Sequence, residues 1–169
     1  MAATRIALGG FIAAFACGSA FAGDCVRSTP AAIFAGDRAG VQAHAFVLKS
    51  DHEATERFRL VSGMQVDVEL GGCEYVVTTF RFQSKADSAA ASFKEAASLL
   101  RTLQSEHADI TFDLNLAAAT LLKEASRKPR LDRELAVRGD GVPPLEAVVT
   151  VGRKSASGPL EVTLFRGPL

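Results

Sequence analysis

The stretch TERFRLVSGMQVDVEL, residues 55–70, decides the fold, because apolar and polar side chains alternate on both sides of a Ser-Gly pair. Alternation with a period of two predicts two strands, and the Ser-Gly pair predicts the turn between them. A three-residue loop with Gly63 in the left-handed conformation sets Phe58 opposite Val66. A two-residue loop would mix the apolar and polar faces. We therefore expect a bulged antiparallel hairpin with one buried face.

The polar face of this hairpin supports the same register. It places Arg57 opposite Asp67, a cross-strand ion pair that contributes roughly a few tenths of a kcal/mol. Residues 43–49 alternate in the same way and predict a strand before the hairpin. Three further segments predict strands near the C-terminus, namely residues 133–139, 145–154 and 160–166.

Another strand is predicted at residues 73–82, directly after the pair Gly71-Gly72. We interpret this pair as a two-residue turn, which sets Leu70 opposite Cys73. The inner face then continues through Cys73, Tyr75 and Val77. The opposite face is too apolar for water, and something must cover it. Its residues are Val76, Phe80 and Phe82.

Two helices are predicted between this strand and the C-terminal ones. The first has Ser84 as its N-cap and an apolar stripe at helical spacing. The stripe consists of Phe93, Ala96, Ala97, Leu100 and Leu103, and the polar side of Lys94, Ser98, Arg101 and Ser105. The second helix spans residues 117–128, with Asn115 as its cap and Pro129 enforcing its end. Residues 109–114 fit either a strand or the first turns of this helix, and their alternation favours the strand.

The order of these elements predicts an α+β fold. We expect a mostly antiparallel sheet of about six to eight strands with two helices packed on it. The length of the chain suits one domain, residues 23–169. Residues 23–40 are rich in small residues, Gly and Pro, and predict an irregular N-terminal arm.

Residues 1–22 have the features of a secretory signal peptide. Arg5 supplies a positive start, an uncharged run of roughly a dozen residues follows, and Ala20-Phe21-Ala22 offers the small residues that signal peptidase recognises. The run is shorter than the ~20 apolar residues that span a bilayer, so we expect cleavage after residue 22 and no membrane span.

A lipid anchor at Cys17 is the alternative end of this leader. Phe15 argues against it, because lipoprotein leaders carry a smaller residue at that position. We therefore expect a protein without lipid in the periplasm of a Gram-negative cell, or a secreted one.

The exported chain keeps two cysteines, Cys25 and Cys73. Paired thiols in an oxidising compartment normally form a disulfide, so we predict a bridge between them. It would close a loop of nearly fifty residues, for which chain entropy gives a stabilisation of about 4 kcal/mol.

The charge balance excludes two classes of partner. The chain has 19 basic and 19 acidic residues without a block of like charge. Nucleic acid binding needs a basic face that neutralises phosphates, and an anionic membrane surface attracts basic segments. We expect neither partner. The sequence also lacks a glycine-rich phosphate loop, and we expect no cofactor.

The sequence shows no catalytic constellation. His52-Glu53 resembles the start of the HExxH zinc signature, but Glu56 stands where the second histidine is required, so we expect no metal site. His44 shares the apolar side of its strand, and we interpret it as a hydrogen-bonded histidine at the edge of the core. A nucleophile elbow is absent, and bridged cysteines are not nucleophiles. Two carboxylates distant in sequence can still meet in space.

Ser62-Gly63, at the tip of the first hairpin, resembles part of the Ser-Gly-x-x-Tyr signature of periplasmic lysozyme inhibitors. In that family the loop enters the lysozyme cleft. Here Val66 occupies the tyrosine position, and the predicted register buries it. The resemblance therefore covers two residues only and identifies no family.

These observations favour a binding module over an enzyme. We expect an exported periplasmic module of the binding or inhibitor type that acts on another protein of the cell envelope through loops, such as Ser62 and Gly63, or through a strand edge. The alternative is a carrier of a small apolar ligand, held between the helices and the sheet face that bears Val76, Phe80 and Phe82. A further alternative is a hydrolase with dispersed carboxylates.

Overall fold

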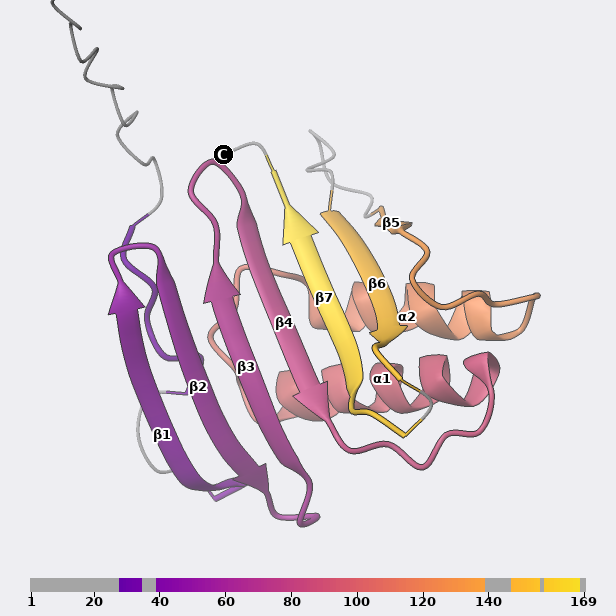
Figure 1. The fold of residues 1–169 in the computed structure, drawn as a ribbon, viewed down its shortest axis with the longest axis horizontal. Coiled ribbons are helices and arrows are strands. Elements are labelled where there is room, and N and C mark those ends of the chain that lie inside the picture. Colours follow the sequence, from indigo (N-terminus) through magenta and orange to yellow (C-terminus); the bar gives the residue numbers. More distant parts are fainter. Residues whose placement is uncertain (1–27, 35–38, 139–146, 156, 168–169) are drawn as a thin grey trace, which may run out of the picture.

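A computed structural model describes residues 28–34, 39–138, 147–155 and 157–167 of the chain. These ranges form seven strands and two helices (Figure 1). The strands are β1 (Val41–Ser50), β2 (Glu53–Leu60), β3 (Gln65–Gly71), β4 (Val76–Phe82), β5 (Leu135–Val137), β6 (Ala147–Arg153) and β7 (Leu160–Arg166). The helices are α1 (Ala89–Ser105) and α2 (Leu114–Ala125). The predicted signal peptide, Cys17 and Cys25 lie outside the described residues.

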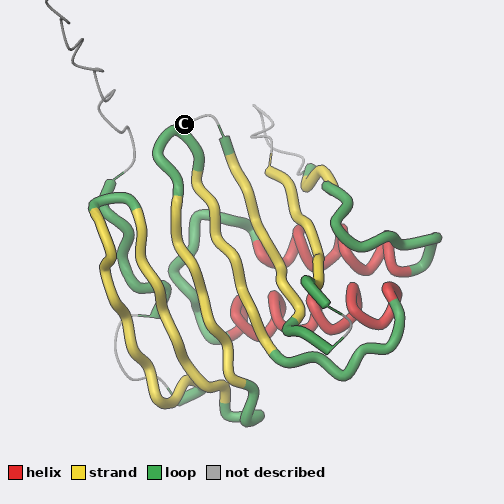
Figure 2. The backbone as a smooth tube through the Cα atoms, viewed as in Figure 1, coloured by secondary structure: helices red, strands yellow, loops and turns green. Residues whose placement is uncertain are grey.

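The seven strands form one antiparallel sheet in the order β1-β2-β3-β4-β7-β6-β5. The two helices lie side by side against one face of the sheet, and no described helix or strand covers the other face (Figure 1, Figure 2). We call the uncovered side the outer face. The arrangement confirms the predicted α+β class, with a strand number inside the expected range.

The first hairpin has the predicted bulged register. Phe58 lies opposite Val66, and Arg57 lies opposite Asp67. Gly63 has a φ of 83°, the left-handed conformation that glycine adopts without a steric penalty, and its N–H donates to the Leu60 carbonyl at 2.8 Å. The hydrophobic pattern and the Arg57–Asp67 pair therefore predicted the correct turn length.

The turn between β3 and β4 differs from the prediction. Leu70 lies opposite Thr78, and β4 begins at Val76. The connection spans residues 72–75, and Gly72 takes a φ of 109° where a Cβ would meet the Tyr75 carbonyl. The longer turn changes the register by an odd number of residues, which moves every side chain of β4 to the opposite face.

This change corrects the predicted faces of β4. Val76, Phe80 and Phe82 point toward the helices, on the same side as the apolar residues of β3. Tyr75, predicted inside, is 40% exposed and stacks on Phe165 of β7 with ring centroids 5.1 Å apart. The helices and the N-terminal arm together therefore cover the apolar side of the sheet.

Both helices begin at caps other than those predicted. Ser88 caps α1 by accepting a hydrogen bond from the Ala91 N–H, whereas the Ser84 hydroxyl accepts from Ala86 N–H instead. Asp113 caps α2, and Asn115 lies inside the helix. Residues 109–113 form an irregular connection, so the predicted strand there is wrong. Its alternating apolar residues, which suggested a strand, lie against the core from a loop.

The core lies between the sheet and the helix pair. Its largest fully buried side chains include Phe34, Phe58, Phe80 and Phe93. Phe34 comes from the N-terminal arm and meets Phe58 edge-on, with centroids 4.9 Å apart. Burial of a phenylalanine contributes about 1.5–3 kcal/mol. The described part of the arm, residues 28–34, is irregular as predicted, and it supplies part of the core.

Candidate functional site

The predicted site residues lie in two separate places. Ser62 and Gly63 are exposed at the tip of the β2–β3 hairpin, next to Val61, which is 62% exposed. Val76, Phe80 and Phe82, the residues expected to contact an apolar ligand, are buried in the core. The structure therefore does not bring the two groups together.

A hollow of about 520 Å³ lies beside Val76. Residues 28–33 of the arm, the loop 109–111 and the ends of β3 and β4 surround it, and most of the lining side chains are small or aliphatic. Phe80 and Phe82 do not line it. Cys73 belongs to the β3–β4 turn next to this hollow, and its predicted partner Cys25 lies outside the described residues, so the bridge stays a prediction.

Glu56 is a buried carboxylate that sequence reasoning missed. Its side chain lies on the buried face of β2, among apolar residues, and has no solvent exposure. Three donors surround it: the N–H groups of Ile33 and Phe34, at 2.6 and 3.2 Å, and Nε2 of His44 at 2.8 Å. A carboxylate in an apolar core is tolerated only when its oxygens are paired in this way. The available signal was Glu56 itself, a charged residue at an apolar position of the alternating pattern.

A bulge in β1 directs His44 toward Glu56. The register of β1 against β2 shifts between Gln42 and Ala45, and Ala43 has a φ of 50°. The extra residue turns the His44 ring inward, where 15% of its side chain remains exposed. This confirms His44 as a hydrogen-bonded histidine at the edge of the core. These hydrogen bonds hold the arm and β1 against β2, because Glu56 belongs to β2 and every donor belongs to the arm or to β1.

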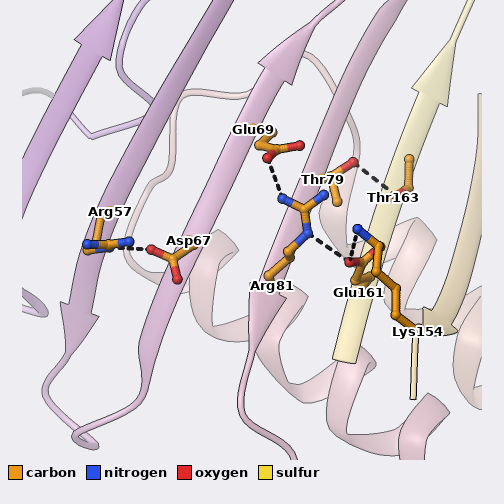
Figure 3. Close-up of polar contacts among 8 residues, drawn as sticks. All are labelled: Arg57, Asp67, Glu69, Thr79, Arg81, Lys154, Glu161 and Thr163. Atoms are coloured by element: carbon orange, nitrogen blue, oxygen red, sulfur yellow. Dashed lines mark hydrogen bonds and ion pairs between the residues drawn. The ribbon is translucent and has the colours of Figure 1, made fainter. Parts of the chain in front are cut away.

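A ladder of paired charges crosses the outer face (Figure 3). Arg57 of β2 pairs with Asp67 of β3. Arg81 of β4 lies between Glu69 and Glu161, with nitrogen–oxygen distances of 2.5 and 2.8 Å (Figure 3). The hydrogen bond from Arg81 lowers the pKa of Glu69, and the hydrogen bond to Glu69 raises the pKa of Arg81.

The remaining polar side chains of this ladder also have partners. Lys154 lies 3.5 Å from Glu161, and the hydroxyls of Thr79 and Thr163 share a hydrogen bond of 3.0 Å (Figure 3). Side chains whose charges are already paired stabilise the register of a sheet and offer few free polar groups to a ligand. The ladder is therefore a structural element of the sheet.

The edge strand β1 borders a second hollow, of about 440 Å³, on the outer face. The lining combines Ala45, Val47 and Thr55 with charged side chains of the ladder. Val47 is 57% exposed, and Leu48, on the other side of the strand, is 46% exposed. In the described part of the chain, β1 pairs with β2 alone, so its second edge is open.

The described residues contain no metal-ligand cluster, since no three His, Cys, Asp or Glu side chains gather as ligands would. None of their helices has the length and apolar character needed to cross a membrane. Neither a family model, nor a curated protein, nor a solved structure matches the chain. The function is therefore inferred from the surfaces of this chain.

Proposed function

We propose that the protein is an exported binding module of the cell envelope that contacts another protein through the edge strand β1. The support is one observation: Val47 and Leu48 are exposed on an open strand edge beside a hollow in the outer face. Natural edge strands usually avoid exposed aliphatic side chains, because an open edge templates pairing with other chains.

The geometry of β1 suits the addition of a strand from the partner. Val47 lies opposite Thr55 on the outer face, and Leu48 lies opposite Ala54 on the inner face. An extended segment beside β1 would bury both side chains, one on each face. Main-chain hydrogen bonds would supply affinity, and the hollow next to Val47 would select a side chain of the partner.

The hairpin tip is a second candidate surface for contact with a partner protein. Ser62 and Gly63 stand at the end of β2 remote from Thr55, so the tip and the exposed part of β1 are separate surfaces. A partner held in an inhibitor-type contact would use the tip. Val61 is the exposed aliphatic residue there.

Two matched variants distinguish the edge from the tip. Val47→Glu places one negative charge on the edge, whereas Val61→Glu places one negative charge on the tip. We expect the edge variant to lose a partner that cross-links to the wild-type protein in intact cells, and Val61→Glu to keep it. Quantitative mass spectrometry of the cross-linked material measures both. Loss by Val61→Glu alone would assign the contact to the tip.

Export is proposed from the leader pattern, and the predicted disulfide offers a test. Ser28 and Val76 line the same hollow, and each stands three residues from one cysteine of the pair. Three residues span at most about 10 Å, a length compatible with the predicted bridge. Peptide mapping of the protein from the envelope should recover the two cysteines linked, on a chain that begins at Gly23. A chain diacylated at Cys17 would contradict this.

A carrier of a small apolar ligand is the second candidate, favoured by the hollow beside Val76. Its volume falls within the range of small-molecule sites. Native mass spectrometry of the protein purified from its own cells should then show a bound molecule, and Val76→Asp should lose it. A hydrolase has less support, because the hydrogen bond from Arg81 lowers the pKa of Glu69, which makes this carboxyl unsuited to act as a general acid.

A further inference from the structure

The solvent side of the helix pair carries a groove of about 400 Å³. It is lined by Leu122 of α2 and by six residues of α1, namely Lys94, Ala97, Ser98, Arg101, Thr102 and Ser105. Ala97 is buried and Leu122 half-buried, so the floor is narrow and apolar. Lys94 and Arg101 are exposed along the α1 side of the groove. The groove lies across the molecule from the outer face, so it does not depend on the proposed function of β1.

The two cations of this groove differ from those of the ladder because they are unpaired. No carboxylate of the described residues lies in ion-pair distance of Lys94 or Arg101. The acidic residue of α2 nearest in sequence to Leu122, Glu124, already pairs with Arg133 at 3.2 Å. Lys123, in the last turn of α2, adds a further positive charge. The groove therefore carries two cations that have no ion-pair partner among the described residues.

Two of the three hydroxyl groups that line the groove already donate to the backbone of α1, and the third belongs to the exposed Ser98. The Thr102 hydroxyl donates to the Ser98 carbonyl at 3.0 Å, and the Ser105 hydroxyl donates to the Thr102 carbonyl at 2.8 Å. An anion in the groove would thus be held by the charges of Lys94 and Arg101. These residues are seven positions apart in the helix, which separates them by about 10 Å along its axis.

We propose that this groove binds an acidic segment of a partner polypeptide. Two carboxylates about 10 Å apart would match the spacing of the cations, a distance that an extended chain covers in three residues. An aliphatic side chain between them would lie over Ala97 and Leu122. A compact anion such as phosphate would contact one cation only, and a membrane surface would not enter a groove between two helices.

The probe is a ten-residue peptide of glutamates with leucine at every third position. Titrated into the isotope-labelled protein at low salt, it should shift the backbone amide resonances of α1 and the C-terminal turn of α2. Lys94→Glu with Arg101→Glu should weaken the binding at least ~10-fold, because repulsion replaces attraction at both positions. Lys49→Glu with Arg59→Glu, a matched reversal on the sheet, should leave it unchanged.

Three results would overturn the proposal. The first is the absence of shifts in α1 and α2 at millimolar peptide, and the second is an equal loss in both double variants, which would indicate non-specific attraction. The third is binding of vesicles of phosphatidylglycerol, or of inorganic phosphate, that depends on Lys94 and Arg101 while the peptide does not bind. Circular dichroism of each variant establishes that the fold is intact.

Discussion

The two solvent-facing sides of this protein use their charges in opposite ways. On the outer face of the sheet, Arg57 and Arg81 are paired with carboxylates on neighbouring strands. On the helical side, Lys94 and Arg101 have no acidic partner within the described residues. Cross-strand neighbours lie about 5 Å apart, so a sheet can satisfy its own charges, and a charged side chain left unpaired is free to meet a ligand. The difference separates charges that hold the fold from charges that are open to binding.

Among the paired carboxylates of the sheet, Glu56 is the buried one, and its removal should have the largest effect on stability. Glu56→Ala leaves His44 and the N–H groups of Ile33 and Phe34 without an acceptor in the core. We expect a loss of about 3–5 kcal/mol in the free energy of unfolding, measured by urea denaturation. Glu69→Ala, an exposed member of the same sheet, should cost less than about 1 kcal/mol. Equal losses in the two variants would mean that burial does not determine how much each carboxylate contributes to the free energy of unfolding.

The ladder on the outer face gives an intermediate effect. Arg81→Met keeps the aliphatic stem and removes both ion pairs, and we expect a loss of about 1 kcal/mol because the partner carboxylate of Glu69 is half exposed. Arg59→Met, which breaks no ion pair, is the control. A loss in the control as large as that in Arg81→Met would indicate that the ladder does not stabilise the sheet.

The same variant also predicts a pH dependence. Arg81 lowers the pKa of Glu69, so this carboxylate stabilises the fold above its ordinary value of 4.5 and loses that contribution as the pH falls through the lowered value. The stability difference between wild type and Arg81→Met should therefore shrink on acidification below pH 4.5. If this stability difference does not change with pH, Glu69 does not account for the effect of Arg81 on stability.

The smallest effect on stability is expected on the helical side. Lys94→Glu with Arg101→Glu should change the free energy of unfolding by no more than about 0.5 kcal/mol, since these cations hold no partner in the fold. Thermal and urea denaturation both measure it. A large destabilisation would mean that the two residues are structural, and the contrast between the two sides would disappear.

Alternation of side chains was enough to predict most strands and the register of the first hairpin. Phe58, Val66 and the glycine at position 63 left one arrangement in which the apolar face stays intact. The turn at Gly72 was predicted wrongly, because a glycine pair is compatible with several loop lengths and only the packing of Val76, Phe80 and Phe82 under the helices selects one. Local sequence does not contain that information.

The surfaces were predictable to different degrees. The polar side of α1, including Lys94 and Arg101, follows from helical spacing. Its groove does not, because Leu122 comes from another helix. The anchor at Glu56 depends on the N-terminal arm and on a bulge in β1, both distant in sequence from Glu56. The exposed Val47 and Leu48 required the strand order, since β1 is open only as the last strand of the sheet.

Amide hydrogen exchange of the protein, alone and bound to a partner recovered by cross-linking, tests the role of β1 most directly. We expect binding to slow exchange in β1 far more than in β5, the strand at the other edge, because a strand added to β1 would hydrogen-bond its free groups. Protection confined to residues 61–63, or equal at both edges, would contradict the proposal that the β1 edge receives the partner.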